Sequence, residues 1–357
     1  MYNGISNTVP TDPIVGGFPV IHGGGGSDSA FIMKVQTDIS TASSAKSNDD
    51  QFQIVVNGSG YTFDYEVDWG DNSTDSGVTG NITHTYATPG VYIVKVTGTF
   101  PNIYFFNRFD RYKLLEIQNW GNIEWATMLN AFWGCENVEI TATDTADMSR
   151  VTSFSQAFRS CKSVTSFPNA ANWVTDSCTS CTLMFYFCEE NTSVDTSGWN
   201  TRNVTSFSYA FGQNQKLTSL DGSTWNLGKC EQFYQTFANC LDLTTITGNG
   251  NWRFHTTVNV DFSSMFQNCF VLDGLNTTNW NTEKVTTLSQ TFRECRALTE
   301  LDLSNWNLSN CTSLYIWIYN CHELTTLGDV SNLDVSNIVQ GAYMFSGVDK
   351  LTTDVSN

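Results

Sequence analysis

The chain has 357 residues and a formal net charge of −18, with 40% hydrophobic but only 15% charged residues. That length and apolar content predict a folded protein with a sizeable core. The negative charge argues against nucleic acid or an anionic membrane as a partner. No stretch approaches the ~18 consecutive apolar residues of a membrane span, so we also expect no membrane insertion.

Residues 1–28 form a segment punctuated by Gly and Pro, with a glycine run at 23–26. The segment lacks the basic and apolar regions of a secretory signal peptide. Either a leader was trimmed from the sequence, or the protein reaches its surface without being secreted. We interpret residues 1–28 as an extended arm with a glycine joint, and we expect it to dock on a neighbouring subunit.

Residues 29–100 alternate apolar and polar side chains in short runs separated by Gly, Asn, Asp and Ser. The runs read FIMKVQT, QFQIVV, YTFDYEVDW and VYIVKVTG. Period-two alternation predicts the strands of a small antiparallel sandwich. The motifs YEVDWGD, HTY and PGVY in this region resemble a PKD-type immunoglobulin-like domain. In that family, the Trp-Gly-Asp turn and the His-x-Tyr strand brace one edge of the sandwich.

Three acidic residues of this region, Asp68, Asp71 and Asp75, are either turn residues or calcium ligands. Turn chemistry explains them equally well, so we expect no metal and no cofactor. The next segment, 101–131, begins with the aromatic and aliphatic run 103–106 and is too apolar for a linker. We expect it to join the residues on either side of it and to cap the open end of a stack that begins at residue 132.

From residue 132 onward, an apolar anchor recurs about every 26 residues and is usually followed three positions later by cysteine. A fixed period in this range is typical of a stacked repeat protein, so we expect a solenoid over residues 132–357. The anchors are Phe132, Phe158, Phe185, Phe211, Phe237, Phe266, Phe292, Ile318 and Phe345.

Each repeat unit has a common pattern around its anchor. A Trp usually lies twelve residues before it, often followed by Asn, and aliphatic residues lie six and nine after it. The short alternating L-x-x-L-x-L segment predicts one strand of a parallel sheet per unit. The S-x-x-F-x-x-C segment predicts a single helical or 3₁₀ turn on the opposite side. We expect the Asn to satisfy backbone groups at the bend between them.

The eleven cysteines follow the repeat. Seven lie three residues after an anchor, and the others fill positions where sister units carry apolar or small residues. Buried cysteine behaves as a small hydrophobe, so we interpret the thiols as core packing. Cys178, Cys181 and Cys188 are spaced like half a zinc site but have no second pair and no nearby histidine. A ladder of unpaired thiols favours assembly in a reducing cytoplasm.

The W-N-x-x-x-V-T-x-x-x-x-x-F-x-x-C register, with the sandwich in front of it, resembles the BspA-like leucine-rich-repeat surface proteins. Repeats of this kind also occur in mycoplasma lipoprotein-like sequences. The resemblance covers about residues 29–357 and implies a mainly β fold with short helical turns: an Ig/PKD-like sandwich followed by a leucine-rich-repeat-type solenoid. It also implies a surface adhesin that binds host proteins, other cells or matrix, although the secretion signal of such proteins is missing.

No catalytic motif is evident. The four histidines lie at unrelated positions, and none has a serine or cysteine partner in a recognisable nucleophile motif. The acidic pairs at 49–50 and 189–190 fit solvated loops better than a glycosidase site. We therefore expect a protein that is not an enzyme.

Three functions fit these patterns. The first is a structural protein of a bacteriophage virion: a head fibre, capsid decoration or tail-associated protein. It would dock on a capsid or tail protein through residues 1–28, form a homo-oligomer, and display the solenoid at the virion surface to a host protein or glycan. The second is an adhesin on the bacterial cell surface, and the third is a carbohydrate-binding module or a carbohydrate-active enzyme.

Any ligand is expected on the exposed face of the predicted strands. That face is rich in Thr and Asp and offers hydrogen bonds to sugars or protein loops. It fits equally well a solubilising sheet surface chosen for β propensity. The candidate ligand-binding residues are Thr218, Ser219, Asp221, Thr244, Thr245, Thr247, Thr299, Glu300, Asp302, Thr325 and Thr326.

Overall fold

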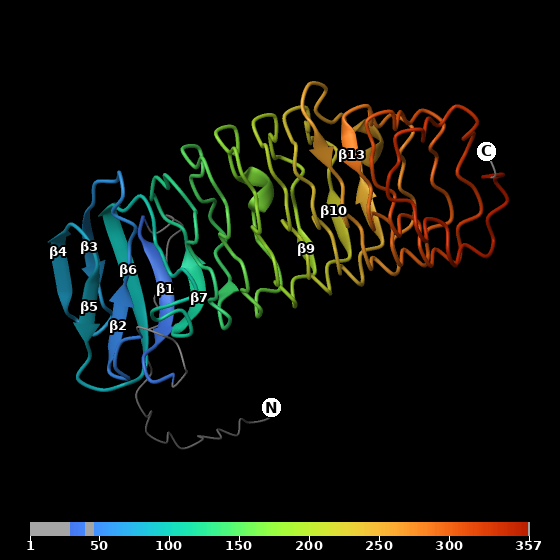
Figure 1. Cartoon of the computed structure of the whole chain (residues 1–357). Helices are drawn as coiled ribbons and strands as arrows, with labels where there is room; N and C mark the ends of the chain where they lie inside the picture. Colours follow the sequence, from blue (N-terminus) through green and yellow to red (C-terminus); the bar gives the residue numbers. More distant parts are fainter. Residues whose placement is uncertain (1–28, 40–45, 356–357) are drawn as a thin grey trace, which may run out of the picture.

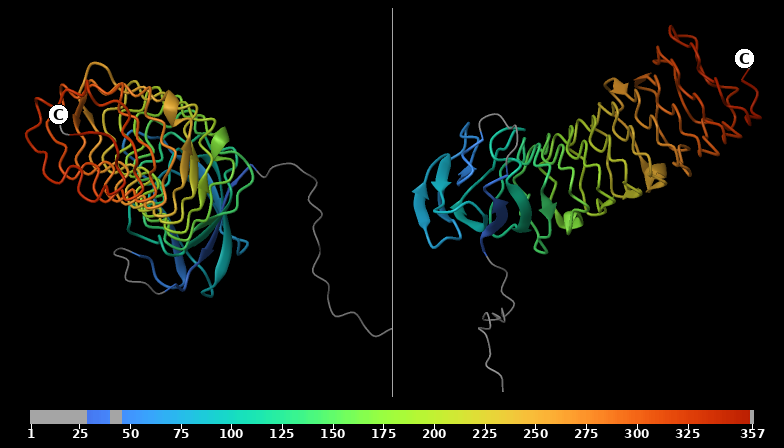
Figure 2. Two further views of the ribbon diagram at one scale, coloured as in Figure 1. Left: turned by 90° about the vertical axis from the view of Figure 1, so that its right-hand side faces the viewer. Right: turned by 90° about the horizontal axis from the view of Figure 1, so that it is seen from below.

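The computed structural model describes residues 29–39 and 46–355, and within them the protein is mainly β with almost no helix. Figure 1 shows a strand-rich N-terminal part followed by a long row of coils that leads to the C-terminus. Two further directions of view show the coils stacked side by side (Figure 2). The arm expected at residues 1–28 lies outside the described residues.

The N-terminal part contains the predicted antiparallel strands. All four alternating runs include a strand, which confirms these predictions, while β4 and β7 were not expected. The largest sheet has the order β4-β3-β6-β1-β7-β8, and β2 pairs with β5 in a separate antiparallel pair. The strands are β1 (Phe31–Gln36), β2 (Gln51–Ile54), β3 (Asp64–Asp68), β4 (Thr74–Val78), β5 (Ile82–Thr85), β6 (Val91–Thr99), β7 (Leu114–Asn119) and β8 (Glu139–Ile140).

The largest sheet continues into the coils. Strand β1 pairs antiparallel with β6 on one side and with β7 on the other, and β7 pairs parallel with β8 of the first coil. Phe31 on β1 packs against Trp125 at 5.1 Å between ring centroids and against Phe132 at 6.5 Å. The boundary expected at residue 100 therefore lies within one sheet and one continuous hydrophobic core.

Successive coils are joined by short parallel ladders. One ladder lies on the L-x-x-L-x-L segment, as predicted, and includes the three-stranded parallel sheet β11-β10-β9. A second ladder, which the sequence did not suggest, lies five residues before the anchors and includes the pair β12-β13. The strands are β9 (Ser193–Val194), β10 (Ser219–Asp221), β11 (Thr245–Thr247), β12 (Val260–Asp261) and β13 (Val285–Thr287).

The segment around each anchor is not helical, so the predicted helical or 3₁₀ turn was wrong there. It consists instead of consecutive turns, with left-handed residues two positions before and two after the anchor, such as Gln156 (φ 58°) and Ser160 (φ 59°) around Phe158. In a type II turn, the third of the four residues has a left-handed conformation. The two short 3₁₀ turns, η1 (Ala170–Asn172) and η2 (Asn249–Asn251), lie elsewhere in the coil, each just before a Trp.

These turns have a consequence for hydrogen bonding between coils. Alternate N–H groups of each turn segment point to the next coil, as in the bonds from Phe132 N to Ala157 O (2.8 Å) and from Phe158 N to Met184 O (2.9 Å). A 3₁₀ turn would use successive N–H groups within its own coil instead. On this side of the stack the donors therefore point towards the C-terminal end and the acceptors towards the N-terminal end. We call this arrangement the polar ladder.

Candidate functional site

The predicted strand-face residues lie on neighbouring coils and largely face solvent. Ser219 lies opposite Thr245, and Asp221 opposite Thr247, in the β10-β11 pair, while Glu300 bridges to Thr326. The structure therefore brings the candidates together in two patches on one side of the stack. The exposed members are Thr218, Ser219, Thr244, Thr247, Thr299, Glu300 and Thr325, and the half-buried members are Asp221, Thr245, Asp302 and Thr326.

Several hydroxyl groups of this face are already engaged. Thr244 Oγ1 donates to Thr218 O at 2.9 Å, and Thr325 Oγ1 donates to Thr299 O at 3.0 Å. Thr218 makes the same kind of bond, at 3.3 Å, to the coil before it. A threonine whose hydroxyl donates to the neighbouring coil ties two coils together. These bonds support the interpretation of Thr218, Thr244 and Thr325 as structural residues of the sheet.

The two carboxylates of the face are engaged in local turns. Asp221 accepts a hydrogen bond from Ser223 N at 2.9 Å, and Asp302 accepts bonds from Ser304 N at 3.0 Å and Ser304 Oγ at 2.6 Å. Hydrogen bonds from these serines lower the pKa of both carboxyl groups. Both groups are therefore anionic at neutral pH, and each holds an Asx turn.

A row of aromatic side chains runs along a different face and was missed by the sequence analysis. Ring centroids of Tyr186 and Tyr209 lie 5.3 Å apart, and those of Tyr209 and Tyr234 lie 5.0 Å apart. The Arg159 guanidinium lies 4.5 Å from the Trp133 ring centroid and 5.7 Å from that of Tyr186. The aromatic row comprises Tyr104, Phe106, Trp133, Tyr186, Tyr209 and Tyr234, all half-buried.

The aromatic row was difficult to find because its members do not share one repeat position. Trp133 and Tyr186 follow their anchors by one residue, whereas Tyr209 and Tyr234 precede theirs by two and three. Burial raises the pKa of Tyr209 to about 12, so its hydroxyl stays protonated at neutral pH. The row therefore presents neutral aromatic rings, phenolic hydroxyls and one guanidinium on neighbouring coils.

The three acidic residues weighed as calcium ligands each have a protein partner. Asp68 accepts from Gly70 N at 2.9 Å, and Asp75 accepts from Trp69 Nε1 at 2.8 Å. Asp71 Oδ2 lies 2.9 Å from His84 Nε2. Although partial burial opposes the change, hydrogen bonds from Ser73 and His84 lower the pKa of Asp71 to about 2. Within the described residues, no group of His, Cys, Asp and Glu is arranged to hold a metal ion.

All eleven cysteines are buried and unbridged, which confirms the predicted burial. Most thiols that lie three residues after an anchor also donate a hydrogen bond, as Cys161 Sγ does to Phe132 O at 3.2 Å. Asn214 replaces cysteine in one unit and donates to Phe185 O at 2.9 Å. Because an amide can substitute there, the thiol acts as a donor between coils in addition to filling the core.

Cys178 and Cys181 are the one pair of thiols in the described residues whose sulfurs are in mutual hydrogen-bond contact, at 3.7 Å. The bond from Cys181 lowers the pKa of Cys178 and raises that of Cys181. Both side chains are buried, so the pair faces the core and no open site.

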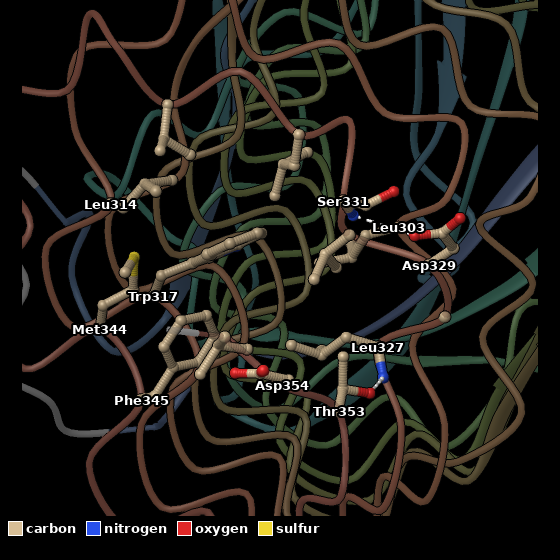
Figure 3. A pocket seen from close by; sticks show the side chains of 15 residues that line it. Leu303, Leu314, Trp317, Leu327, Asp329, Ser331, Met344, Phe345, Thr353 and Asp354 are labelled. Carbon is tan, nitrogen blue, oxygen red and sulfur yellow. Dashed lines mark hydrogen bonds between the residues drawn. The ribbon is translucent and has the colours of Figure 1, made fainter. Parts of the chain in front are cut away.

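The C-terminal end of the stack holds an apolar cavity of about 320 Å³. Figure 3 shows Trp317, Met344 and Phe345 on one side of it and Leu327 on another, with Asp329 and Asp354 among the labelled polar residues. We call this cavity the end groove. In the coil of Phe345, Val339 is 82% exposed and Tyr343 is 65% exposed. The residues equivalent to Tyr343 in the coils before it are buried or half-buried.

Comparison with known protein families assigns the coils to one family. The chain belongs to the family described as "Mycoplasma protein of unknown function, DUF285", which matches residues 103–193, 173–269 and 260–357. The three matches follow one another along the stack, so the protein is a repeat-containing member of this family. No curated protein and no solved structure matches the chain. In the described part of the chain, no helix is long and apolar enough to cross a bilayer.

Proposed function

We propose that the coils form a leucine-rich-repeat-type solenoid of the BspA-like class, preceded by a PKD-like immunoglobulin-type sandwich. The short parallel strands on the L-x-x-L-x-L segments support the first assignment. The aromatic bracing of the sandwich edge supports the second. There the Trp69 and His84 rings stack at 4.8 Å between centroids, and Tyr86 Oη donates to Trp69 O at 3.1 Å.

The protein acts, in this proposal, as a non-enzymatic display and attachment component of a virion surface. It is a bacteriophage head fibre, capsid decoration or tail-associated protein. Residues 1–28 attach it to a capsid or tail protein or to another copy of the chain, and the solenoid is presented to a host surface protein or glycan. The observation that carries this proposal is the continuous sheet from β1 through β7 to β8. It joins sandwich and coils into one stiff rod that carries long periodic faces.

The proposal is tested by comparing three chains for incorporation into purified phage particles. We expect the full chain to be retained in the particles and a chain without residues 1–28 to be lost from them. A chain carrying Val258→Asp, an exposed position far from the arm in sequence, is the matched control and should be incorporated normally. Normal incorporation without the arm would contradict the proposal. Detection of the protein on bacterial cells and not in particles would favour the alternative, a BspA-like cell-surface adhesin.

A second candidate function is carbohydrate binding, favoured by the aromatic row. Aromatic rings with nearby polar groups are suited to the apolar faces and hydroxyls of sugar rings. Their repetition on neighbouring coils matches a ligand that itself repeats. We expect Tyr186→Ala and Tyr209→Ala to weaken binding to a panel of soluble glucans, mannans and alginate, measured by affinity electrophoresis. Tyr315→Ala, an exposed tyrosine outside the row, is the control. No binding by the unmodified chain would eliminate this candidate.

A further inference from the structure

The last coil that the structure describes has a hydrogen-bonding edge without a partner among the described residues. In the coil of Ile318, four backbone N–H groups donate to carbonyls of the last coil. They belong to Leu314, Ile316, Ile318 and Asn320. An example is Ile318 N to Met344 O at 2.9 Å. The corresponding donors of the last coil are the N–H groups of Gly341, Tyr343, Phe345 and Gly347. These four groups have no acceptor within residues 29–39 and 46–355.

The edge lies beside an apolar surface that is also incompletely covered. The end groove includes Trp317, Met344 and Phe345. Met344 and Phe345 are only half-buried, whereas the residues in the same register are buried in the coils before them. Exposed apolar surface next to unpaired backbone donors is the usual template for adding a strand. The polar ladder makes this edge unusual, because it presents donors only and so requires a partner that presents carbonyl groups.

One segment of the chain has the chemistry that this edge requires. Residues 13–21 read PIVGGFPVI, an uncharged apolar run outside the described residues. In an extended segment, alternate residues turn their N–H and C=O groups to the same side. Pro13 and Pro19 are six residues apart, so they share a side with Val15, Gly17 and Ile21. The two prolines bring carbonyls to that side without an N–H, which lowers the number of donors that would face the donors of the edge to three. An uncharged segment also suits a groove lined by the carboxylates of Asp329 and Asp354.

The length of the chain determines which copy supplies the segment. Ser29 O accepts from Asn122 N at 2.9 Å, so residue 29, which follows the arm in sequence, lies beside the coil of Phe132. The coil of Phe345 lies eight coils further on, roughly 38 Å away at ~4.8 Å per coil. Residues 22–28 span at most about 28 Å when fully extended at ~3.5 Å per residue. The segment 13–21 therefore cannot lie along the end of its own stack.

We infer that residues 13–21 of one copy bind as an added strand to the end groove of a second copy, with their carbonyls on the free N–H groups of the last coil. The inference rests on the proposed role of residues 1–28 as an attachment segment, and it names a second copy of the chain as the partner. Because each copy carries one arm and one groove at opposite ends, the contact is head-to-tail and produces open linear chains.

A complementation experiment with the full chain tests this inference. Phe18→Asp places a charge in the arm segment, and Phe345→Asp places one in the groove. We expect the unmodified chain to form a concentration-dependent series of oligomers between about 1 and about 100 µM. Each variant alone should be monomeric, with association weakened by roughly tenfold or more. An equimolar mixture of the two should form a dimer and nothing larger, because one partner supplies the intact arm and the other the intact groove.

Two controls and one direct readout complete the design, with masses measured by light scattering. Ile5→Asp, in the arm but outside the segment, and Val258→Asp, on the stack, should oligomerise as the unmodified chain does. Circular dichroism checks that Phe345→Asp remains folded. If it does not, hydrogen exchange of the Gly341 to Gly347 amides is the deciding measurement. These amides should be protected in the unmodified chain and unprotected in Phe18→Asp.

The remaining outcomes contradict the inference. A monomeric unmodified chain, or a Phe18→Asp chain that still oligomerises, excludes the arm as the occupant. Oligomers that depend on the groove but not on the arm would indicate that another surface of the chain fills it. If deletion of residues 1–28 prevents incorporation into particles while self-association is unchanged, the inference fails and the proposed function stands.

Discussion

At the N-terminal end of the stack, the segment around Phe105 lies on the first coil and donates from Phe105 N to Ala131 O (2.9 Å) and from Asn107 N to Trp133 O (2.8 Å). At the C-terminal end, the coil of Phe345 has no such neighbour among the described residues. The two ends differ because the polar ladder has a direction. The N-terminal end exposes carbonyls and needs a donor segment, whereas the C-terminal end exposes N–H groups and needs an acceptor segment. Only the first need is met by residues that the structure describes.

The largest predicted difference is in the stability cost of removing a core phenylalanine at each end of the stack. Phe31 is fully buried at the covered end among Phe100, Trp120 and Trp125. Phe345 at the open end is half-buried and has one aromatic neighbour at 6.2 Å. We expect Phe31→Ala to lower the free energy of unfolding by about 3–5 kcal/mol, because it leaves a cavity in packed surroundings.

The matched variant, Phe345→Ala, should cost less than about 1 kcal/mol, since solvent already reaches its side chain. Both values come from urea denaturation of the two variants and the unmodified chain under the same conditions. At protein concentrations too low for the chains to associate, equal losses at the two ends would show that the end groove is covered within its own chain, and would remove the contrast between the ends.

A second contrast concerns charge. At the covered end, Lys113 Nζ lies 3.7 Å from Asp110 Oδ1 and donates to Asn48 O at 2.7 Å, and both side chains are almost fully buried. At the open end, the Lys350–Glu323 pair is half-exposed. We expect Lys113→Met to cost about 3 kcal/mol, because it leaves the buried Asp110 carboxylate without its counterion.

Lys350→Met should change the free energy of unfolding by less than about 1 kcal/mol, since solvent screens an exposed pair. Thermal unfolding in low and high salt distinguishes the two sites. The Lys113→Met loss should persist at high salt, whereas any effect at Lys350 should disappear. A salt-sensitive loss at Lys113 would mean that water reaches the buried pair.

The acid response of the two ends should differ as well. The pKa of Asp71 is lowered to about 2, so its contribution to stability is present above pH ~4 and is lost as the pH falls from ~4 towards 2. His322 and Asp349 at the open end form an exposed pair. Asp71→Asn should remove about 1–2 kcal/mol of stability at pH 6 but little at pH 2.

Asp349→Asn is the matched control and should leave the unfolding curve unchanged from pH 6 to pH 2. The measurement is the urea midpoint of each chain over this pH range. A constant gap between Asp71→Asn and the unmodified chain down to pH 2 would indicate that Asp71 acts through packing and not through its charge.

The covered core could be predicted from the sequence because it follows local rules. Alternation gave β1 and β6, and the period of about 26 residues placed Phe158 and Cys161 in the buried register. The pairing of β1 with β7 could not be predicted, because contacts between residues far apart in the chain leave no local pattern. The left-handed residues two after the anchors had a partial signal in Gly134, Asn239 and similar residues, which tolerate that conformation.

The candidate site was less predictable than the fold. The threonines were correctly placed on the outer face, but the sequence contains no sign that the Thr244 hydroxyl bonds to the coil before it. The aromatic row depends on how side chains from different positions of the repeat converge in space. Tyr186 and Tyr209 lie next to each other only because the coils stack in a particular register. A search by repeat position cannot find such a cluster.

The smallest effect tests whether the cysteines do more than fill space. Cys269 Sγ donates to Phe237 O at 3.1 Å in the interior of the stack, while the last coil has Val348 at the same position. We expect Cys269→Val to lower the free energy of unfolding by about 1 kcal/mol, since it replaces a donor with an apolar group that the repeat tolerates at its end. Val348→Cys should change it by only a few tenths, because the open end gains a donor in a half-exposed coil. Urea denaturation under reducing conditions measures both. If Cys269→Val is as stable as the unmodified chain, the thiol contributes packing alone, as its position in the repeat first suggested.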